Sequence, residues 1–382
     1  MTVLWCRPLV PPSGAVLWHD APEPLYSARA MIHSHPIAPP APESAPAPTV
    51  LALLDGLAGS NSQTRGVVQA LGLPARDVAV TYAREWPWAR LVGHVRPTPP
   101  TAAALLDGPA PALVVSTGRR AGAAARWLKD TLRRRDGGAG PRLLHIQDPR
   151  FAHDAFDLIA VPAHDRSLET LRQRDNVLVV TGAPHPLTAA RLAEAAEAWR
   201  PTVSALPRPW ITVLVGGDSG RRRLDAAVAT QLAAQASALA ARAGGSLLVT
   251  TSRRTRPDAV AALRAELSAG PAPHTLYAWT PDPAGNPYLG FLGLADASVV
   301  TGDSISMLTE ATTTARPLFI FAPAGWARGP HARYHTALIE AGVARPLADD
   351  TAWATWQGAA INPAETIAQT ARARLKLSET AG

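Results

Sequence analysis

Glycine and hydroxyl residues follow apolar runs at four points of the chain, in a pattern that suits binding of a phosphorylated ligand. The four segments are LLDGLAGSNSQTRG (53–66), VLVGGDSG (213–220), LLVTTSRRTRP (247–257) and ASVVTGDSISMLTEA (297–311). Glycine lets a ligand approach the main chain closely, and the free N–H groups at a helix start attract anions. Each segment is therefore a candidate part of a ligand site.

In the first segment, Gly56 and Gly59 permit a tight turn between an apolar strand and a helix. We expect one of residues 60–62 to cap that helix, which carries Gln63 and runs over 63–71. An ordinary strand–helix turn explains the same spacing equally well. There is no Walker lysine and no dinucleotide-binding fingerprint that would specify a nucleotide.

The second segment places Gly216 and Gly217 directly after an apolar run. A glycine pair there lets a phosphate or a sugar contact the main chain, although a plain turn is an equal alternative.

In the third segment, Ser252 and Thr255 flank Arg253 and Arg254 at the end of a predicted strand. The forked guanidinium group suits a diphosphate because it can bind two oxygens at once. The alternative is a pair of solvated or acid-paired arginines.

The fourth segment is the most informative. Its strand is expected to end at 302–304, and Ile305 or Ser306 is expected to begin a helix whose free N–H groups suit a pyrophosphate. Glu310 falls on the helix face of Ser306 and Met307, where a carboxylate can accept both hydroxyls of a ribose. An exposed helix carboxylate is the alternative for Glu310. The candidate ligand-binding residues of this segment are Thr301, Asp303, Ser304, Ser306, Met307 and Glu310.

Candidate acid–base residues are His164, Asp165 and His185, which lie near predicted strand ends in FDLIAVPAHD and NVLVVTGAPHPL. Each is equally well explained as a turn residue whose hydrogen bonds are satisfied. The sequence has no HExxH or GxSxG motif and a single cysteine, so we expect no metal site and no serine-hydrolase chemistry.

A formal net charge of +7 raises the question of nucleic-acid binding. The excess is nearly all arginine scattered along the chain, and no nucleic-acid-binding motif accompanies it, so no nucleic-acid partner is expected. No apolar run of the length of a membrane span occurs, and the start of the chain is unlike a signal peptide. We expect a cytoplasmic protein and leave peripheral contact with the inner membrane open.

Strand-like runs alternate with alanine-rich helical stretches, which predicts the α/β class with parallel sheets. We expect a proline-rich, poorly ordered extension over 1–48, a first Rossmann-like domain over 49–205 and a second over 206–382. The helix expected over 364–377 would cross back to the first domain. Met31 is an alternative start of translation.

The motifs resemble, in order, the blocks of the mitochondrial fission (elongated-mitochondria) family, bacterial members included. The blocks run from DGLAGSNSQTRG through HIQDPR, VLVGGDSG and LLVTTSRRT to NPYLGFLGLADASVVTGDSISMLTEA and ARPLFIFAP, and span about residues 51–323. For the plant members, the resemblance implies recruitment of a dynamin-related protein in mitochondrial division.

The fourth segment is also similar to the donor site of the lipid-linked N-acetylglucosaminyltransferase of murein synthesis. Glu310 matches the ribose-binding glutamate, Ser304 and Ser306 match the phosphate-facing turn, and Arg316–Pro317 match the end of the motif, with Ala315 where glycine is usual.

These resemblances imply a GT-B-like fold, with two Rossmann-like domains facing across a cleft. They also imply a glycosyltransferase with a nucleoside-diphosphate sugar as the donor substrate, no cofactor, and an unknown acceptor, whose association with a membrane is left open. A non-catalytic scaffold of the same fold and a nucleotide-sugar epimerase are the alternatives.

Overall fold

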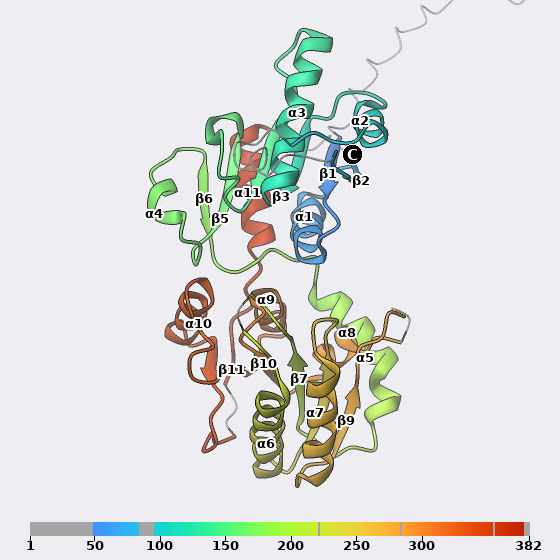
Figure 1. The fold of residues 1–382 in the computed structure, drawn as a ribbon, viewed down its shortest axis with the longest axis vertical. Coiled ribbons are helices and arrows are strands. Elements are labelled where there is room, and N and C mark those ends of the chain that lie inside the picture. Colours follow the sequence, from blue (N-terminus) through green and yellow to red (C-terminus); the bar gives the residue numbers. More distant parts are fainter. Residues whose placement is uncertain (1–48, 84–94, 221, 283–284, 354–355, 378–382) are drawn as a thin grey trace, which may run out of the picture. The chain divides into compact units, whose positions relative to one another are not determined.

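A computed structural model describes residues 49–83, 95–220, 222–282, 285–353 and 356–377 (Figure 1). The expected proline-rich extension over 1–48, with Cys6 and Met31, lies outside the described residues. Within the described residues, no helix combines the length and apolar character needed to cross a membrane.

The first sheet is parallel in all its pairings and has the strand order β2-β1-β3-β4-β5-β6. Its strands are β1 (Val50–Leu54), β2 (Ala75–Ala79), β3 (Leu113–Thr117), β4 (Arg142–Ile146), β5 (Leu158–Pro162) and β6 (Val177–Val180). The helices in this part of the chain are α1 (Ala58–Leu71), α2 (Pro99–Leu106), α3 (Arg119–Asp136) and the short α4 (Leu168–Leu171). The alanine-rich side of α3 packs on one face of the sheet, and α1 packs on the other.

The second sheet is also parallel, with the order β12-β11-β10-β7-β8-β9. Its strands are β7 (Trp210–Val215), β8 (Ser246–Thr251), β9 (His274–Tyr277), β10 (Ala297–Thr301), β11 (Leu318–Phe321) and β12 (Ala344–Pro346). The helices between them are α6 (Ala226–Arg242), α7 (Pro257–Ala269), α8 (Tyr288–Leu294), α9 (Ile305–Thr312) and α10 (Pro330–Glu340).

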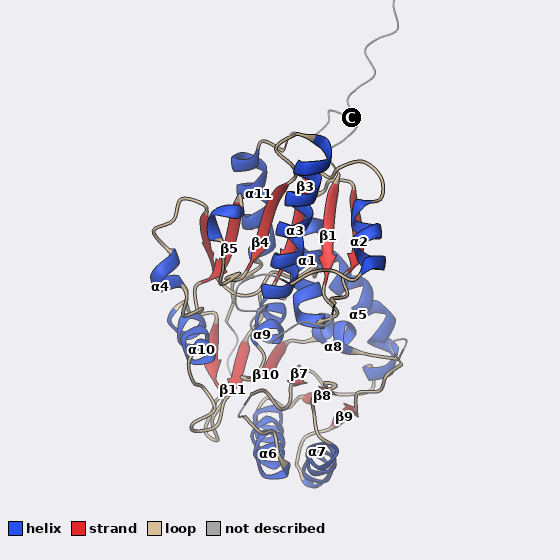
Figure 2. Ribbon diagram, turned by 45° about the horizontal axis from the view of Figure 1, so that its top comes forward, coloured by secondary structure: helices blue, strands red, loops and turns tan. Residues whose placement is uncertain are grey.

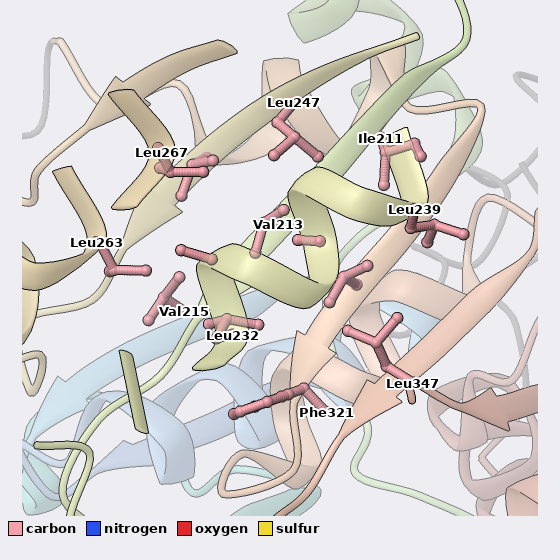
Figure 3. Close-up of a cluster of buried hydrophobic side chains, with 14 of the residues drawn as sticks. Ile211, Val213, Val215, Leu232, Leu239, Leu247, Leu263, Leu267, Phe321 and Leu347 are labelled. Atoms are coloured by element: carbon pink, nitrogen blue, oxygen red, sulfur yellow. The ribbon is translucent and has the colours of Figure 1, made fainter. Parts of the chain in front are cut away.

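The largest buried cluster lies between the second sheet and the helices α6 and α7 (Figure 3). Leu232 and Leu239 of α6 pack toward Ile211 and Val213 of β7, and all four side chains are almost fully buried. Burying a leucine or isoleucine side chain stabilises the fold by about 1.5–3 kcal/mol. This cluster therefore provides a rigid base for the loops that leave the carboxyl ends of the strands.

Two helices pack away from the sheet that precedes them in the chain. α11 (Pro363–Leu375) follows the second sheet but packs against α1 and the first sheet, where Figure 1 shows it in red. α5 (Ala189–Val203) follows the first sheet but packs against α8, and Ala196 joins the cluster of Trp210 and Phe291. The limit expected at 205/206 thus separates the two sheets in sequence but not their covering helices, and the domain limits stay predictions.

The expected fold class is confirmed: the chain is α/β and has two six-stranded parallel sheets (Figure 2), as the resemblance to GT-B proteins predicted. The strand-like runs named above all form strands. β2 and β12 were not expected, because both are edge strands with exposed residues and lack a continuous apolar run.

The predicted start of α1 is wrong. The helix begins at Ala58, five residues earlier than expected, and its N-cap is Leu57, which makes no side-chain hydrogen bond. Residues 60–62 therefore lie within the helix and do not cap it. Packing of the buried residues on α1 outweighs the low helix propensity of glycine and serine in its first turns.

Candidate ligand site at the carboxyl ends of the strands

The second sheet reverses its strand order between β7 and β10. β7 pairs with β8 on one side and with β10 on the other, and the connections from these two neighbouring strands run to opposite sides. In open parallel sheets, ligands bind in the crevice outside the carboxyl ends of the strands at such a switch point. The segments that leave this point are Gly216–Gly217 after β7 and 302–304 after β10.

The carboxyl group of Asp303 joins the three loops of this edge. Its side chain is fully buried, and Oδ2 accepts hydrogen bonds from the main-chain N–H of Gly217 and from Nη2 of Arg254, each at 3.1 Å. Oδ1 is buried too and has no partner among the described residues. The loops after β7, β8 and β10 are therefore held together by one carboxylate.

Gly216 and Gly217 are required by these close contacts. A Cβ atom on Gly216 would lie 2.2 Å from Oδ1 of Asp303, and one on Gly217 would lie 2.1 Å from the carbonyl oxygen of Arg254. Neither distance is sterically possible, so the loops can meet only with glycine at both positions. Glycine at 216 and 217 therefore allows the loops to pack against one another.

Hydroxyl groups fix the main chain of Gly216. Its N–H donates to Oγ1 of Thr301 at 2.8 Å, and its carbonyl oxygen accepts from Oγ of Ser252 at 2.7 Å and from Oγ1 of Thr255. Thr301, Ser252 and Thr255 thus have structural contacts in the described fold.

The two adjacent arginines after β8 have different surroundings. Arg254 binds Asp303 and also donates to the carbonyl oxygen of Asp218 at 3.1 Å. The exposed Arg253 makes no hydrogen bond or ion pair with any described residue. Arg253 is therefore the arginine of this turn that is free to bind a ligand.

Helix α9 begins at the switch point, as expected. Its N-cap is Ser304, whose Oγ accepts a hydrogen bond from the N–H of Met307 at 3.3 Å. Ser306 and Met307 lie half-buried in the first turn. Because Ser304 supplies the only side-chain cap, other N–H groups of the first turn stay available to an anion.

Glu310 lies one turn and a half into α9 and is paired with Tyr288, whose hydroxyl donates a hydrogen bond to Oε2. Burial raises the pKa of Glu310, and the hydrogen bond from Tyr288 opposes that rise. Burial, followed by the charge of Glu310, raises the pKa of Tyr288 well above its usual value. The phenol thus fixes one oxygen of the carboxylate, Oε2.

A cavity of about 770 Å³ extends along α1 and reaches Arg253 of the second sheet. Its described lining includes three arginines and no carboxylate, and the side chains of Arg191 and Arg253 have no partner among the described residues. The lining residues are Gly56, Ala58, Asn61, Ser62, Arg65, Val68, Gln69, Pro186, Arg191 and Arg253. The cavity thus joins two predicted ligand-binding residues, Gly56 and Arg253, which are far apart in the sequence.

Of the candidates in the first segment, Gly56 lines this cavity, whereas Gly59 and Gln63 do not. Gly56 has a positive φ of 81° and makes the turn, whereas Gly59 is an exposed residue of the first turn of α1. Gln63 is buried, and its Oε1 accepts a hydrogen bond from Nε2 of Gln147 at 3.2 Å.

Of the three acid–base candidates, His185 is buried, and His164 and Asp165 are half-buried. The ring of His164 packs on Tyr334 at 5.1 Å, and burial lowers the pKa of His164 to about 4. Asp165 accepts a hydrogen bond from the N–H of Ser167 in a turn. His185 is 2% exposed, its Nδ1 accepts from the N–H of Leu187, and burial lowers its pKa. Among the described residues, no hydrogen bond or ion pair joins any of the three to Glu310, although His185 lies beside Thr309, and their catalytic role stays a prediction.

Sequence reasoning missed a pair of histidines on α10 that supports the switch point. Nε2 of His331 lies 3.1 Å from the carbonyl oxygen of Asp303, and Nε2 of His335 lies 3.0 Å from that of Gly302. Nδ1 of His331 accepts from Arg222 at 2.9 Å. The spacing of four residues in PHARYH, which puts both histidines on one helix face, is the signal that could have revealed them.

No group of three or more histidine, cysteine, aspartate or glutamate side chains suited to a metal ion occurs in the described ranges. The polar groups of the candidate site are main-chain N–H groups, hydroxyl groups, arginines and the carboxylates of Asp303 and Glu310.

The architecture defines the class of the protein as α/β with two six-stranded parallel sheets. The model of the mitochondrial fission ELM1 family matches residues 58–375, and the chain belongs to that family.

Two relatives and one solved structure show the extent of the similarity. The mitochondrial fission protein ELM1 of Arabidopsis thaliana is 32% identical over 221 residues, which cover 53% of this chain and 50% of the plant protein. This match thus spans half the length of the plant relative. An uncharacterized protein of Rickettsia prowazekii is 23% identical over 309 residues, covering 72% of this chain and 83% of its own. The crystal structure of AviGT4, a glycosyltransferase involved in avilamycin A biosynthesis, superimposes with a TM-score of 0.44 and 12% identity over 86% of this chain and 97% of that one.

Proposed function

We propose that this protein binds a nucleoside-diphosphate sugar at the carboxyl edge of the second sheet and transfers the sugar to an acceptor on the side of the first sheet. The observation that carries the proposal is the convergence of the loops after β7, β8 and β10 on Asp303 at the switch point between β7 and β10. Switch points of open parallel sheets are the usual place for nucleotide ligands.

The diphosphate of the donor would bind between the start of α9 and Arg253. The N-terminus of α9 offers N–H groups and the positive end of the helix dipole, and Arg253 offers a forked donor with no competing partner. Charge grows on the diphosphate as it leaves the sugar. Fixed donors that face this charge would stabilise the transition state.

Glu310 would bind the ribose. Oε2 is held by Tyr288, so Oε1 has a fixed direction when it accepts a ribose hydroxyl. Fixing the carboxylate beforehand lowers the entropy lost on binding. The acceptor would enter along the cavity beside α1, where Arg65 and Arg191 line the wall.

Isothermal titration of the protein with UDP-, GDP- and ADP-sugars tests the proposal. We expect one of these donors to bind with a stoichiometry of one, and we expect Arg253→Gln and Glu310→Ala each to weaken binding by about tenfold or more. Arg264→Gln, which changes an exposed arginine of α7, is the matched control and should bind as the wild type does.

Absence of binding to all three classes would overturn the proposed donor site. If a donor binds, release of the free nucleoside diphosphate in the presence of a cell extract containing acceptors would then test transfer. Hydrolysis or epimerisation of the sugar without an acceptor would contradict transfer and leave the donor site intact.

A further inference from the structure

A second cavity, of about 760 Å³, lies between the loop after β7 and the loop after β11. It shares no lining residue with the cavity beside α1. Its lining residues are Ser219, Gly220, Arg222, Arg223, Asp225, Val228, Gly325, Trp326, Arg328 and His331. Three of these are arginines and one is a carboxylate.

The guanidinium group of Arg222 is fixed in the wall and has no carboxylate partner among the residues that the structure describes. Its Nε donates to the carbonyl oxygen of Trp326 at 2.7 Å, and Nη2 lies 2.9 Å from Nδ1 of His331. Neutral acceptors hold the group in position but leave its charge uncompensated. Consistent with this, the pKa of His331 is lowered, first by burial and then by the charge of Arg222.

Arg328 lies at the mouth of the same cavity. It is exposed, and its side chain makes no hydrogen bond or ion pair with the described part of the chain. The carboxylates nearby have other contacts: Asp218 pairs with Arg223 at 2.7 Å, and Asp225 caps α6 by accepting from the N–H of Val228. Neither aspartate neutralises Arg222 or Arg328.

Helix α10 contributes further donors. It starts with Pro330 after Gly329, has no side-chain cap, and runs for 11 residues. Pro330 has no N–H and the N–H of Arg333 donates to the carbonyl oxygen of Gly329, so the N–H groups of His331 and Ala332 are the ones left unpaired within the helix. These two groups add to the positive potential of the two arginines.

We infer that this cavity is a second anion site, which binds a phosphomonoester or diphosphate group between Arg222, Arg328 and the start of α10. The inference does not rest on the donor site proposed above, because Arg253 and Glu310 do not line this cavity. A phosphate group fits these donors since forked guanidinium groups and helix N-termini both bind its oxygens.

Titration calorimetry with pyrophosphate on the full chain tests the inference. We expect Arg328→Gln to weaken pyrophosphate binding by about tenfold. Arg328→Lys, which keeps the charge but loses the fork, should have an intermediate affinity. Arg264→Gln serves as the control for loss of an exposed arginine. Arg253→Gln should keep pyrophosphate binding at this cavity, because Arg253 does not line it.

A second experiment identifies the source of the phosphate group. In it, the same variants are co-sedimented with phosphatidylcholine vesicles that contain phosphatidic acid. Loss of vesicle binding in Arg328→Gln would identify a lipid headgroup, and loss of pyrophosphate binding alone would identify a soluble ligand. Equal affinities of wild type and Arg328→Gln for both probes would overturn the inference, as would pyrophosphate binding that only Arg253→Gln reduces. Thermal unfolding of each variant checks that the fold is intact.

Discussion

Nη2 of Arg254 lies 3.1 Å from Oδ2 of Asp303, and this ion pair joins a loop of β8 to a loop of β10. The arginine side chain is 39% exposed, whereas the aspartate side chain is fully buried. The carboxylate therefore depends on the few donors that reach it, and the arrangement of the candidate donor site depends on the pair.

Arg254→Gln should lower the free energy of unfolding by about 1–3 kcal/mol, because the buried carboxylate of Asp303 loses a charged donor. The double variant with Asp303→Asn should lose less than the sum of the single changes, since the amide needs no charged partner. Urea unfolding of the four proteins measures the coupling. Arg200→Gln, which removes an exposed pair with Glu197, should change stability by less than about 1 kcal/mol. Strict additivity of the effects of Arg254→Gln and Asp303→Asn on the free energy of unfolding would show that the two side chains are not coupled.

Gly217→Ala should destabilise the protein by about 1–3 kcal/mol, because the new methyl group would lie 2.1 Å from the carbonyl oxygen of Arg254 and must displace main chain. Gly59→Ala is the matched control. Gly59 is an exposed residue of the first helical turn with open space at its Cβ position, so alanine should change stability by less than about 0.5 kcal/mol. Denaturant unfolding curves of both variants give the two values. Equal effects of both substitutions would contradict the close packing at Gly217.

Glu310→Gln should alter the pH dependence of stability. Burial raises the folded-state pKa of Glu310 above that of the unfolded chain, so the folded protein holds this proton more tightly. Its contribution to stability is present below the unfolded pKa of about 4.3 and is lost as pH rises through the folded pKa.

Relative to Glu310→Gln, the wild type should therefore lose up to about 1.4 kcal/mol per pH unit across that window. Tyr288→Phe should extend this pH range upward, because it removes the hydrogen bond that opposes the rise in the pKa of Glu310. Unfolding free energies measured from pH 4 upward test both effects, with Glu340→Gln at the exposed end of α10 as the control for loss of a glutamate. Parallel curves for wild type and Glu310→Gln would contradict the raised pKa.

The sequence by itself determined the fold class and most of the strands. Central strands such as β3 and β10 are buried on both faces and so appear as continuous apolar runs, which a reader of the sequence can recognise. The helix start at the switch point was also predictable, since serine at 304 follows a strand and precedes a helical pattern.

Only the tertiary structure decided which of the candidate residues meet. Gly216 and Thr301 are 85 positions apart in the sequence, and their hydrogen bond exists because β7 and β10 are neighbours at the reversal of the strand order. Local sequence patterns carry no information about that order. The same holds for Arg254, which binds Asp303 while Arg253 stays free, and for Tyr288, which holds Glu310 from a different helix. Local sequence patterns determine whether a segment forms a helix or a strand. Long-range packing determines which side chains come within hydrogen-bond distance.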